Sequence, residues 1–171
     1  MDLIFFTEAR FHRVNQNRYY SDGNSFSYQM FKKYLTVFDK VYVVARASET
    51  KNHLVDENNR VNKNGVELLP LPYYIGPFQY LKVRNKLVKT LKYYIDQYSK
   101  SAVICRVPGT IGTEASKYLL KKNKPYGVEV VGDPSAAFAP GASQHPFRFL
   151  FRFLGVRALK SVLKGASVYF Y

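Results

Sequence analysis

The chain has 171 residues, a formal net charge of +14 at pH 7, 47% hydrophobic residues and 22% charged residues. This length holds one domain with a sizeable core, and the composition excludes a disordered chain. No apolar run approaches the roughly 20 residues of a membrane span. The start, MDLIFFTE, lacks the basic region and the apolar length of a signal peptide. We therefore expect a cytoplasmic protein.

The positive charge is spread unevenly along the chain. Between Leu68 and Thr113 the only acidic residue is Asp96, and no acidic residue follows Asp133. A surplus of this kind attracts anions, so we expect the partner to be a membrane surface, a nucleic acid or a phosphorylated substrate. Nucleic acid is disfavoured, because the sequence has no helix-turn-helix, no zinc motif and no aromatic set that would stack bases.

Strands and helices alternate along the sequence. Short apolar runs rich in β-branched residues predict six strands, over Leu3–Phe6, Lys40–Ala45, Val66–Leu69, Ala102–Cys105, Tyr126–Val131 and Ser167–Tyr171. Apolar residues at helical spacing predict helices over Phe26–Phe38 and Phe78–Tyr98, a third ending near Lys121 and a fourth ending near Leu163. Polar loops are expected between the first strand and Gly23 and from Arg46 to Gly65.

The first two helices show which side chains they would bury. Ser25 fits the N-cap of the first helix, in which Met30, Tyr34 and Phe38 fall on one face. The second helix has a predicted apolar stripe made of Leu81, Val88, Leu91, Ile95 and Tyr98.

This alternation predicts an α/β fold, with a doubly wound parallel sheet covered by helices on both faces in a Rossmann-like arrangement. We expect a single domain over residues 1–171. The sequence stops inside an apolar strand at Ala166–Tyr171. For that reason we expect these residues to be the front half of a longer protein.

Three charged residues follow directly on predicted strands. Glu8 comes after the first strand, Arg106 after the fourth and Asp133 after the fifth. Because ligands of α/β sheets bind at the carboxyl ends of the strands, we expect all three to converge on one cleft. Asp133 lies between Gly132 and Pro134, a combination that also fits a simple turn, and both interpretations stay open.

Arg106 precedes Gly109 and Thr110 at the start of a predicted helix. Free N–H groups and the helix dipole favour anions there, so these residues predict a phosphate site. The segment has no P-loop motif. In the alternative interpretation, Arg106 is a buried residue that ties the strand ends together.

The single cysteine and the three histidines indicate no metal site. Cys105 ends an apolar strand and is interpreted as a core residue rather than a reactive thiol. His145 precedes a proline, where it would either contact a ligand or cap a helix. His12 and His53 are expected in solvated loops, and the histidines lack the spacing of a helical metal pair.

The segment Phe147–Leu154, FRFLFRFL, is apolar almost all round as a helix. Such a surface is buried in a core, covered by another domain or inserted into the interface of a bilayer. Contact with the inner face of the cytoplasmic membrane is therefore an open alternative to burial. The membrane-facing residues would be Lys82, Lys86, Lys89, Arg148, Phe149 and Arg152.

Several stretches together resemble one known family. They are Thr7–Phe11, Tyr34–Asp39, Val43–Arg46, Val131–Pro134, Phe138–Gly141 and His145-Pro146. In order and spacing they resemble the N-terminal half of bacterial family 4, or group 1, glycosyltransferases of the GT-B fold. The resemblance covers essentially the whole chain. It departs from the family at Glu8-Ala9-Arg10, where many members carry a glycine pair, so donor-phosphate contacts are not carried over from that loop.

The resemblance implies two Rossmann-like domains facing a cleft, of which the first holds the acceptor and the second binds the nucleotide-sugar donor. The E-x7-E signature of the second domain is absent from this chain, and no cofactor is expected here. Contacts to the acceptor or its phosphate would come from Glu8, Arg10, Arg106, Gly109, Thr110 and His145. Asp133 would be the catalytic residue, whose carboxylate orients and deprotonates the acceptor hydroxyl.

The expected function is therefore the acceptor-binding half of a sugar-nucleotide-dependent hexosyltransferase. Its acceptor would be a lipid-linked or otherwise anionic glycan precursor in the assembly of a cell-surface polysaccharide. Without the donor domain the chain is expected to be inactive. The alternative is a non-catalytic basic α/β module that binds an anionic membrane surface or nucleic acid.

Overall fold

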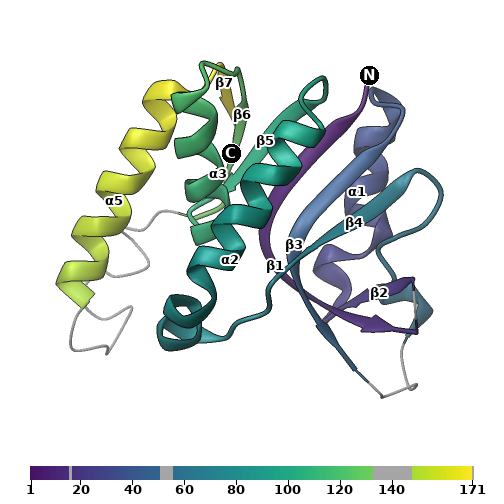
Figure 1. Ribbon diagram of the computed structural model, residues 1–171. Coiled ribbons are helices and arrows are strands. Elements are labelled where there is room, and N and C mark those ends of the chain that lie inside the picture. The colour runs from purple at the N-terminus through teal and green to yellow at the C-terminus, as the bar shows by residue number, and fades with distance from the viewer. Residues whose placement is uncertain (16, 51–55, 133–147, 171) are drawn as a thin grey trace.

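A computed structural model describes residues 1–15, 17–50, 56–132 and 148–170 (Figure 1). Six parallel strands form a sheet in the order β4–β3–β1–β5–β6–β7, and β2 pairs with β1 in the antiparallel direction. The strands are β1 (Leu3–Val14), β2 (Arg18–Ser21), β3 (Val41–Glu49), β4 (Val66–Leu71), β5 (Ala102–Val107), β6 (Gly127–Val130) and β7 (Val168–Phe170). From β1 the chain winds first toward β4 and then back toward β7, which confirms the predicted Rossmann-like α/β fold.

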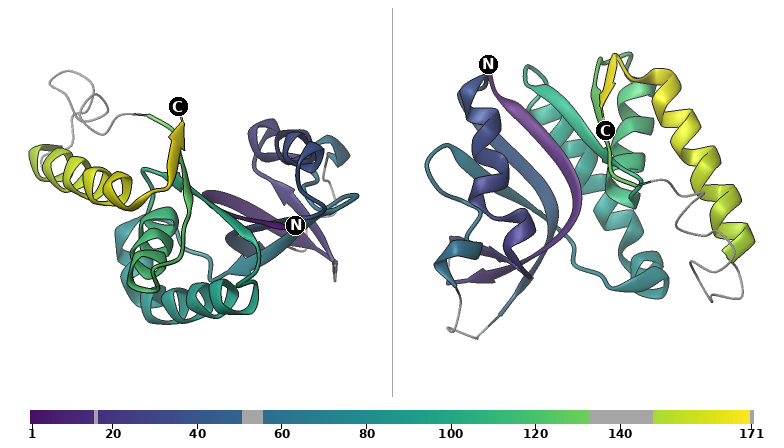
Figure 2. Two further views of the ribbon diagram at one scale, coloured as in Figure 1. Left: turned by 90° about the horizontal axis from the view of Figure 1, so that it is seen from above. Right: turned by 180° about the vertical axis from the view of Figure 1, so that it is seen from behind.

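Helices cover the sheet from both sides (Figure 2). One face carries the 3-10 helix η1 (Asn24–Phe26), α1 (Tyr28–Lys32) and the 3-10 helix η2 (Lys33–Thr36); the short η3 (Glu57–Asn59) precedes β4. The other face carries α2 (Gly76–Gln97) and α3 (Thr110–Lys121), and α5 (Arg148–Gly165) lies beside α3. Because helices cover both faces of the sheet, the strands carry apolar side chains on both sides.

Alternate residues of β1 enter two separate cores. Ile4 and Phe6 join the cluster under α2 and α3, whereas Leu3 and Phe5 join the cluster under α1. The ring of Phe5 meets that of Phe31 edge to face, with the centroids 5.5 Å apart. All four β1 residues are fully buried, which explains why this strand reads as a continuous apolar run.

The predicted loop after the first strand is instead a β-hairpin. β1 continues to Val14, Asn15 turns the chain with a positive φ of 57°, and β2 pairs back onto β1. The pairing between β1 and β3 shifts register between Phe6 and Arg10, so β1 bends at this point. His12 therefore lies in a strand and not in a solvated loop, because its polar neighbours in the sequence are paired across the hairpin.

The first predicted helix is shorter and irregular. It is divided into η1, α1 and η2, and its N-cap is Ser27 rather than Ser25. The inward face is confirmed, since Met30, Tyr34 and Phe38 are partly buried against the core beneath them. Phe31 is buried completely and fixes the segment to the sheet.

The apolar stripe predicted for α2 is correct except at its start. Leu91 and Ile95 are buried, and Val88 and Tyr98 are partly buried. The stripe missed Leu87, which is fully buried, and its first residue Leu81 is 66% exposed, close to Phe78 at 81%. The helix begins beyond the carboxyl ends of β5 and β6, so its first turns have no sheet beneath them (Figure 1). Periodicity shows which residues share a face, but not how far the sheet extends under that face.

α3 approaches β5 unusually closely. A Cβ atom on Gly112 would lie 2.2 Å from the carbonyl oxygen of Arg106, so only glycine fits at this crossing. Beneath α3, Cys105 is fully buried, and burial raises the pKa of its thiol to about 12. The interpretation of Cys105 as a core residue is thereby confirmed.

Candidate functional site

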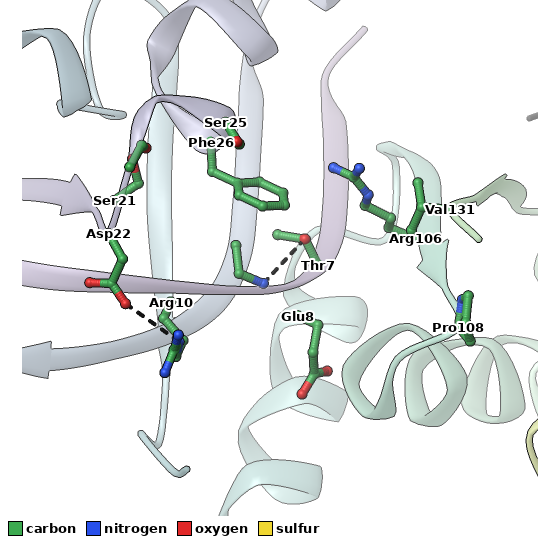
Figure 3. A pocket seen from close by; sticks show the side chains of 12 residues that line it. Thr7, Glu8, Arg10, Ser21, Asp22, Ser25, Phe26, Arg106, Pro108 and Val131 are labelled. Carbon is green, nitrogen blue, oxygen red and sulfur yellow. Dashed lines mark hydrogen bonds and ion pairs between the residues drawn. The ribbon is translucent and has the colours of Figure 1, made fainter. Parts of the chain in front are cut away.

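A pocket with a volume of about 410 Å³ lies at the bend of β1 and the carboxyl end of β5. These neighbouring strands continue into helices on opposite faces of the sheet, which is where α/β folds characteristically bind ligands. Figure 3 shows the residues around it. The lining consists of Thr7, Glu8, Ala9, Arg10, Ser21, Asp22, Gly23, Ser25, Phe26, Arg106, Pro108 and Val131.

Glu8 lines the pocket, but its carboxylate turns away from Phe26 and Arg106 across β1 (Figure 3). One carboxylate oxygen accepts a hydrogen bond from the N–H of Ile111 at 2.9 Å, and the other accepts one from the hydroxyl of Tyr74. Glu8 is therefore a connection between β1, α3 and the segment before α2.

Arg46 reinforces this connection from β3. Its guanidinium donates to the carbonyl oxygens of Tyr74 and Glu8, stacks 4.3 Å from the centroid of the Tyr74 ring and lies 3.5 Å from a carboxylate oxygen of Glu8. Burial raises the pKa of Tyr74, and the negative charge of Glu8 adds to the rise. Tyr74 thus stays a neutral donor to the carboxylate.

The N-terminus of α3 is occupied by this carboxylate. Gly109 is the N-cap residue, and a Cβ atom there would lie 3.2 Å from the Cβ of Glu8. The Ile111 N–H that would face a phosphate already donates to Glu8. The phosphate role predicted for Gly109 and Thr110 therefore has no support in this geometry.

Arg106 projects from β5 toward α1, and its side chain is 20% exposed. Its Nε lies 3.5 Å from a carboxylate oxygen of Glu129, and its guanidinium lies 4.9 Å from the centroid of the Phe26 ring. A further nitrogen lies 3.6 Å from the sulfur of Met30. Arg106 therefore ties β5 to β6 and to the helical segment, and it also forms part of the pocket wall.

Glu129 was not predicted as part of the site. Its residue surface is 8% exposed, and its negative charge adds to burial in raising the pKa of Tyr34 to about 12. The signal in the sequence was a single acid between valines in a buried strand, because a charge in such a place requires a partner.

The opposite wall of the pocket comes from the β1–β2 hairpin, a region whose polar sequence predicts a loop. Arg10 lies 3.4 Å from a carboxylate oxygen of Asp22 (Figure 3). The ring of His12 is hydrogen-bonded through Nε2 to Asp22 and through Nδ1 to Ser48, the latter at 2.8 Å. The hairpin thus brings to the cleft a carboxylate that sequence spacing did not indicate.

The end of β6 reaches the same pocket. Val131 lines it, and the Val131 N–H donates to the carbonyl oxygen of Val107 at 2.7 Å. Gly132 follows with a φ of +89°, a conformation that favours glycine. The predicted catalytic Asp133 and the predicted contact His145 lie outside the described residues.

The predicted membrane-facing residues fall on two helices. Lys82, Lys86 and Lys89 are exposed on α2, and Phe149 is 63% exposed on α5. For Arg148 and Arg152 the structure describes the backbone but not the side chains. In the ranges that the structure describes, no helix combines the length and the apolar character needed to span a bilayer.

Comparisons with known proteins give one relationship in sequence. No family model matches the chain. Over 132 residues, which are 77% of this chain, it is 32% identical to Protein CapJ of Staphylococcus aureus. The aligned part is 32% of CapJ, so the chain spans about a third of the length of the curated relative it matches. The chain thus has a Rossmann-like α/β fold and is similar in sequence to part of Protein CapJ.

Proposed function

We propose that this chain is the acceptor-binding domain of a sugar-nucleotide-dependent glycosyltransferase that takes part in assembling a cell-surface polysaccharide. The observation that carries the proposal is the pocket between β1 and β5, where arginine, carboxylate, hydroxyl and aromatic groups gather at the carboxyl edge of the sheet. The resemblance to group 1 glycosyltransferases and the relationship to Protein CapJ are in keeping with it.

In this proposal the donor is bound by a second domain outside these 171 residues, and the hexosyl group is transferred across the cleft. The acceptor hydroxyl attacks the anomeric carbon, the bond to the donor phosphate breaks, and the nucleoside diphosphate leaves. A base must take the hydroxyl proton. We assign this role to Asp133, which follows within two residues of the pocket-lining Val131.

Membrane contact forms a second part of the proposal. The first turns of α2 expose Ile75, Phe78 and Leu81, and the exposed Lys82 and Lys86 follow directly. Apolar side chains next to lysines suit the interface of an anionic bilayer. This edge of the molecule is also the one where the strands end, so a lipid-linked acceptor would reach the pocket from the membrane (Figure 1).

Isothermal titration calorimetry with nucleotide sugars tests the division of roles. The 171-residue chain should show no micromolar binding of a sugar nucleotide, whereas protein made from the complete reading frame should bind one and transfer its sugar. Micromolar binding to the 171-residue chain would contradict the proposed separation of acceptor and donor domains. Absence of any sugar transfer by the complete protein would contradict the glycosyltransferase assignment itself.

A further inference from the structure

We infer that the pocket recognises an uncharged sugar ring, and that any anionic part of the acceptor binds elsewhere on the molecule. This inference rests on the proposed function and specifies which part of the acceptor the pocket binds. The net charge of the sequence had suggested an anionic ligand instead. The inference is carried by the pairing of charges around the pocket.

Every arginine at the pocket has a carboxylate beside it. Arg10 lies 3.4 Å from Asp22, and Arg106 lies 3.5 Å from Glu129. The carboxylate of Glu8 has its own arginine, Arg46, at 3.5 Å. These three pairs sum to no net charge, although the chain as a whole carries +14.

The Arg106–Glu129 pair is the one that decides against an anion. Both side chains are largely buried, with 20% and 11% of their surfaces exposed. A phosphate or carboxylate bound to Arg106 would place a second negative charge beside the buried Glu129, and one guanidinium neutralises only one of the two anions. A neutral hydroxyl can accept a hydrogen bond from Arg106 while the pair stays intact.

The chain that follows the pocket supplies no additional cation. From Gly132 to Phe147 the sequence contains Asp133 and no lysine or arginine. Apart from His145, this stretch of sequence carries no group whose positive charge could compensate an anion. The local sequence therefore agrees with the pairing in the described residues.

The surplus of positive charge lies on the opposite helical layer. On the described part of the chain, exposed basic residues line the outer surfaces of α2 and α5. They include Lys82, Lys86, Lys89, Lys92, Arg157, Lys160 and Lys164. An anionic lipid phosphate or membrane surface is expected on this layer, away from the α1 side where Arg106 and Glu129 lie.

The polar groups that line the pocket can bind the hydroxyl groups of a sugar. Hydroxyl groups both donate and accept, and the pocket offers guanidinium donors from Arg10 and Arg106 and carboxylate acceptors from Asp22. The hydroxyl of Ser25 can do both, and the ring of Phe26 gives the apolar wall that a sugar ring packs against. The volume of about 410 Å³ falls within the usual range of small-molecule sites, roughly 300–1,000 Å³.

A matched pair of ligands tests the inference on the 171-residue chain. The probes are a neutral methyl hexopyranoside and the methyl hexuronide that differs from it only by a carboxylate at C6, followed by NMR at low and high salt. The hexopyranoside should perturb the signals of Phe26 and Arg106 with an affinity that salt leaves unchanged. The hexuronide should bind more weakly, by about 10-fold or more, since its carboxylate brings a further negative charge to arginines that Asp22 and Glu129 already neutralise.

Variants that remove one carboxylate should change the preference of the pocket between the hexopyranoside and the hexuronide. Glu129→Gln removes the carboxylate behind Arg106 and should shift the preference toward the hexuronide by on the order of 10-fold. Asp22→Asn does the same for the exposed Arg10, so the test survives if the buried substitution prevents folding. Glu67→Gln, on the exposed surface of β4, adds the same unit of charge far from the pocket and should leave selectivity unchanged.

The binding results distinguish failure of the neutral-sugar inference from failure of the proposed acceptor-binding function. Tighter binding of the hexuronide or of inorganic phosphate, weakening with salt and mapping to Arg106, would overturn the neutral-sugar inference and leave the proposed function standing. If neither sugar perturbs the pocket at any concentration up to solubility, both the inference and the acceptor role of this pocket fail.

Discussion

The carboxylate of Glu8, at the bend of β1, accepts a hydrogen bond from the N–H of Ile111 at the N-terminus of α3, 2.9 Å away. The two residues are 103 positions apart in the sequence. This contact joins the two halves of the sheet at the point where the pocket opens. It also fills a helix N-terminus that would otherwise be available to an anion.

Glu8→Ala should lower the free energy of unfolding by about 1–3 kcal/mol, because it leaves the Ile111 N–H and the Tyr74 hydroxyl without their acceptor. Urea denaturation measures the effect. Glu8→Gln keeps an acceptor oxygen and should lose less. Glu49→Gln, at an exposed carboxylate of β3, serves as the control for loss of charge alone. Equal stability of Glu8→Ala and the wild type would show that the contact is not a structural connection.

Gly112→Ala should destabilise the fold by about 1–3 kcal/mol or more, since the new methyl group would lie 2.2 Å from the Arg106 carbonyl oxygen and push α3 off β5. Gly23→Ala is the matched control, because nothing lies within 4 Å of the added Cβ. Thermal unfolding of the two variants should therefore separate clearly. Near-identical midpoints would mean that α3 and β5 are not in such close contact.

Alkaline pH should unfold the protein partly through Tyr34. Burial and the charge of Glu129 raise the pKa of Tyr34 to about 12, above its ordinary value near 10. The unfolded chain loses this proton first, so the contribution is fully present below about pH 10 and is lost as the pH rises toward 12. Tyr34→Phe should reduce this loss, which denaturation curves at several alkaline pH values will show.

Tyr34→Phe should also leave stability at neutral pH unchanged or slightly higher, because the Tyr34 hydroxyl is buried with no hydrogen-bond partner among the described residues. Tyr126→Phe is the contrast. Its hydroxyl donates to the Val162 carbonyl oxygen at 2.8 Å, so this variant should lose about 1 kcal/mol at neutral pH. If Tyr34→Phe is the more damaging of the two, Tyr34 has a partner that the described residues do not include.

Lysines on α2 should control binding to anionic vesicles. Each cation near an anionic leaflet contributes about 1 kcal/mol, so Lys82, Lys86 and Lys89 replaced together by Gln should weaken co-sedimentation by on the order of 100-fold. Replacing Lys32, Lys33 and Lys40 by Gln removes the same charge elsewhere and should have little effect. If the unmodified chain ignores anionic vesicles at low salt, the exposed apolar turns of α2 serve contacts with protein instead.

If the complete protein transfers sugar as proposed, Asp133→Asn should lower its turnover by about 100-fold or more, the usual scale for a positioned acid or base. The amide preserves the shape of the side chain but cannot take the hydroxyl proton, so circular dichroism should show an unchanged fold. Sugar transfer is measured with saturating acceptor. Near-normal turnover would assign Asp133 to the turn between Gly132 and Pro134 and would leave the base to be sought among other carboxylates at the cleft, such as Asp22.

Local sequence patterns were enough to predict the class of fold and most of its helices and strands. Runs such as Leu3–Phe6 and Ala102–Cys105 are apolar because both faces of their strands are covered, and the spacing of Leu91 and Ile95 follows from the helix repeat. Apolar runs and helical spacing are local properties, so they can be recognised within a short stretch of sequence. Topology predicted that Glu8 and Arg106 would lie at one cleft, and both line the pocket, although each lies within its strand rather than after it.

Only the tertiary structure decided what those residues contact. Glu8 bonds to α3 rather than to a ligand, Arg106 is balanced by Glu129, and Asp22 reaches the cleft through a hairpin that resembled a polar loop. Each of these contacts joins separate elements, and no local pattern records which partner a charge will find. Partner choice depends on how the strands register and how the helices pack. For this reason the sequence indicated a basic protein, whereas the fold made its pocket neutral.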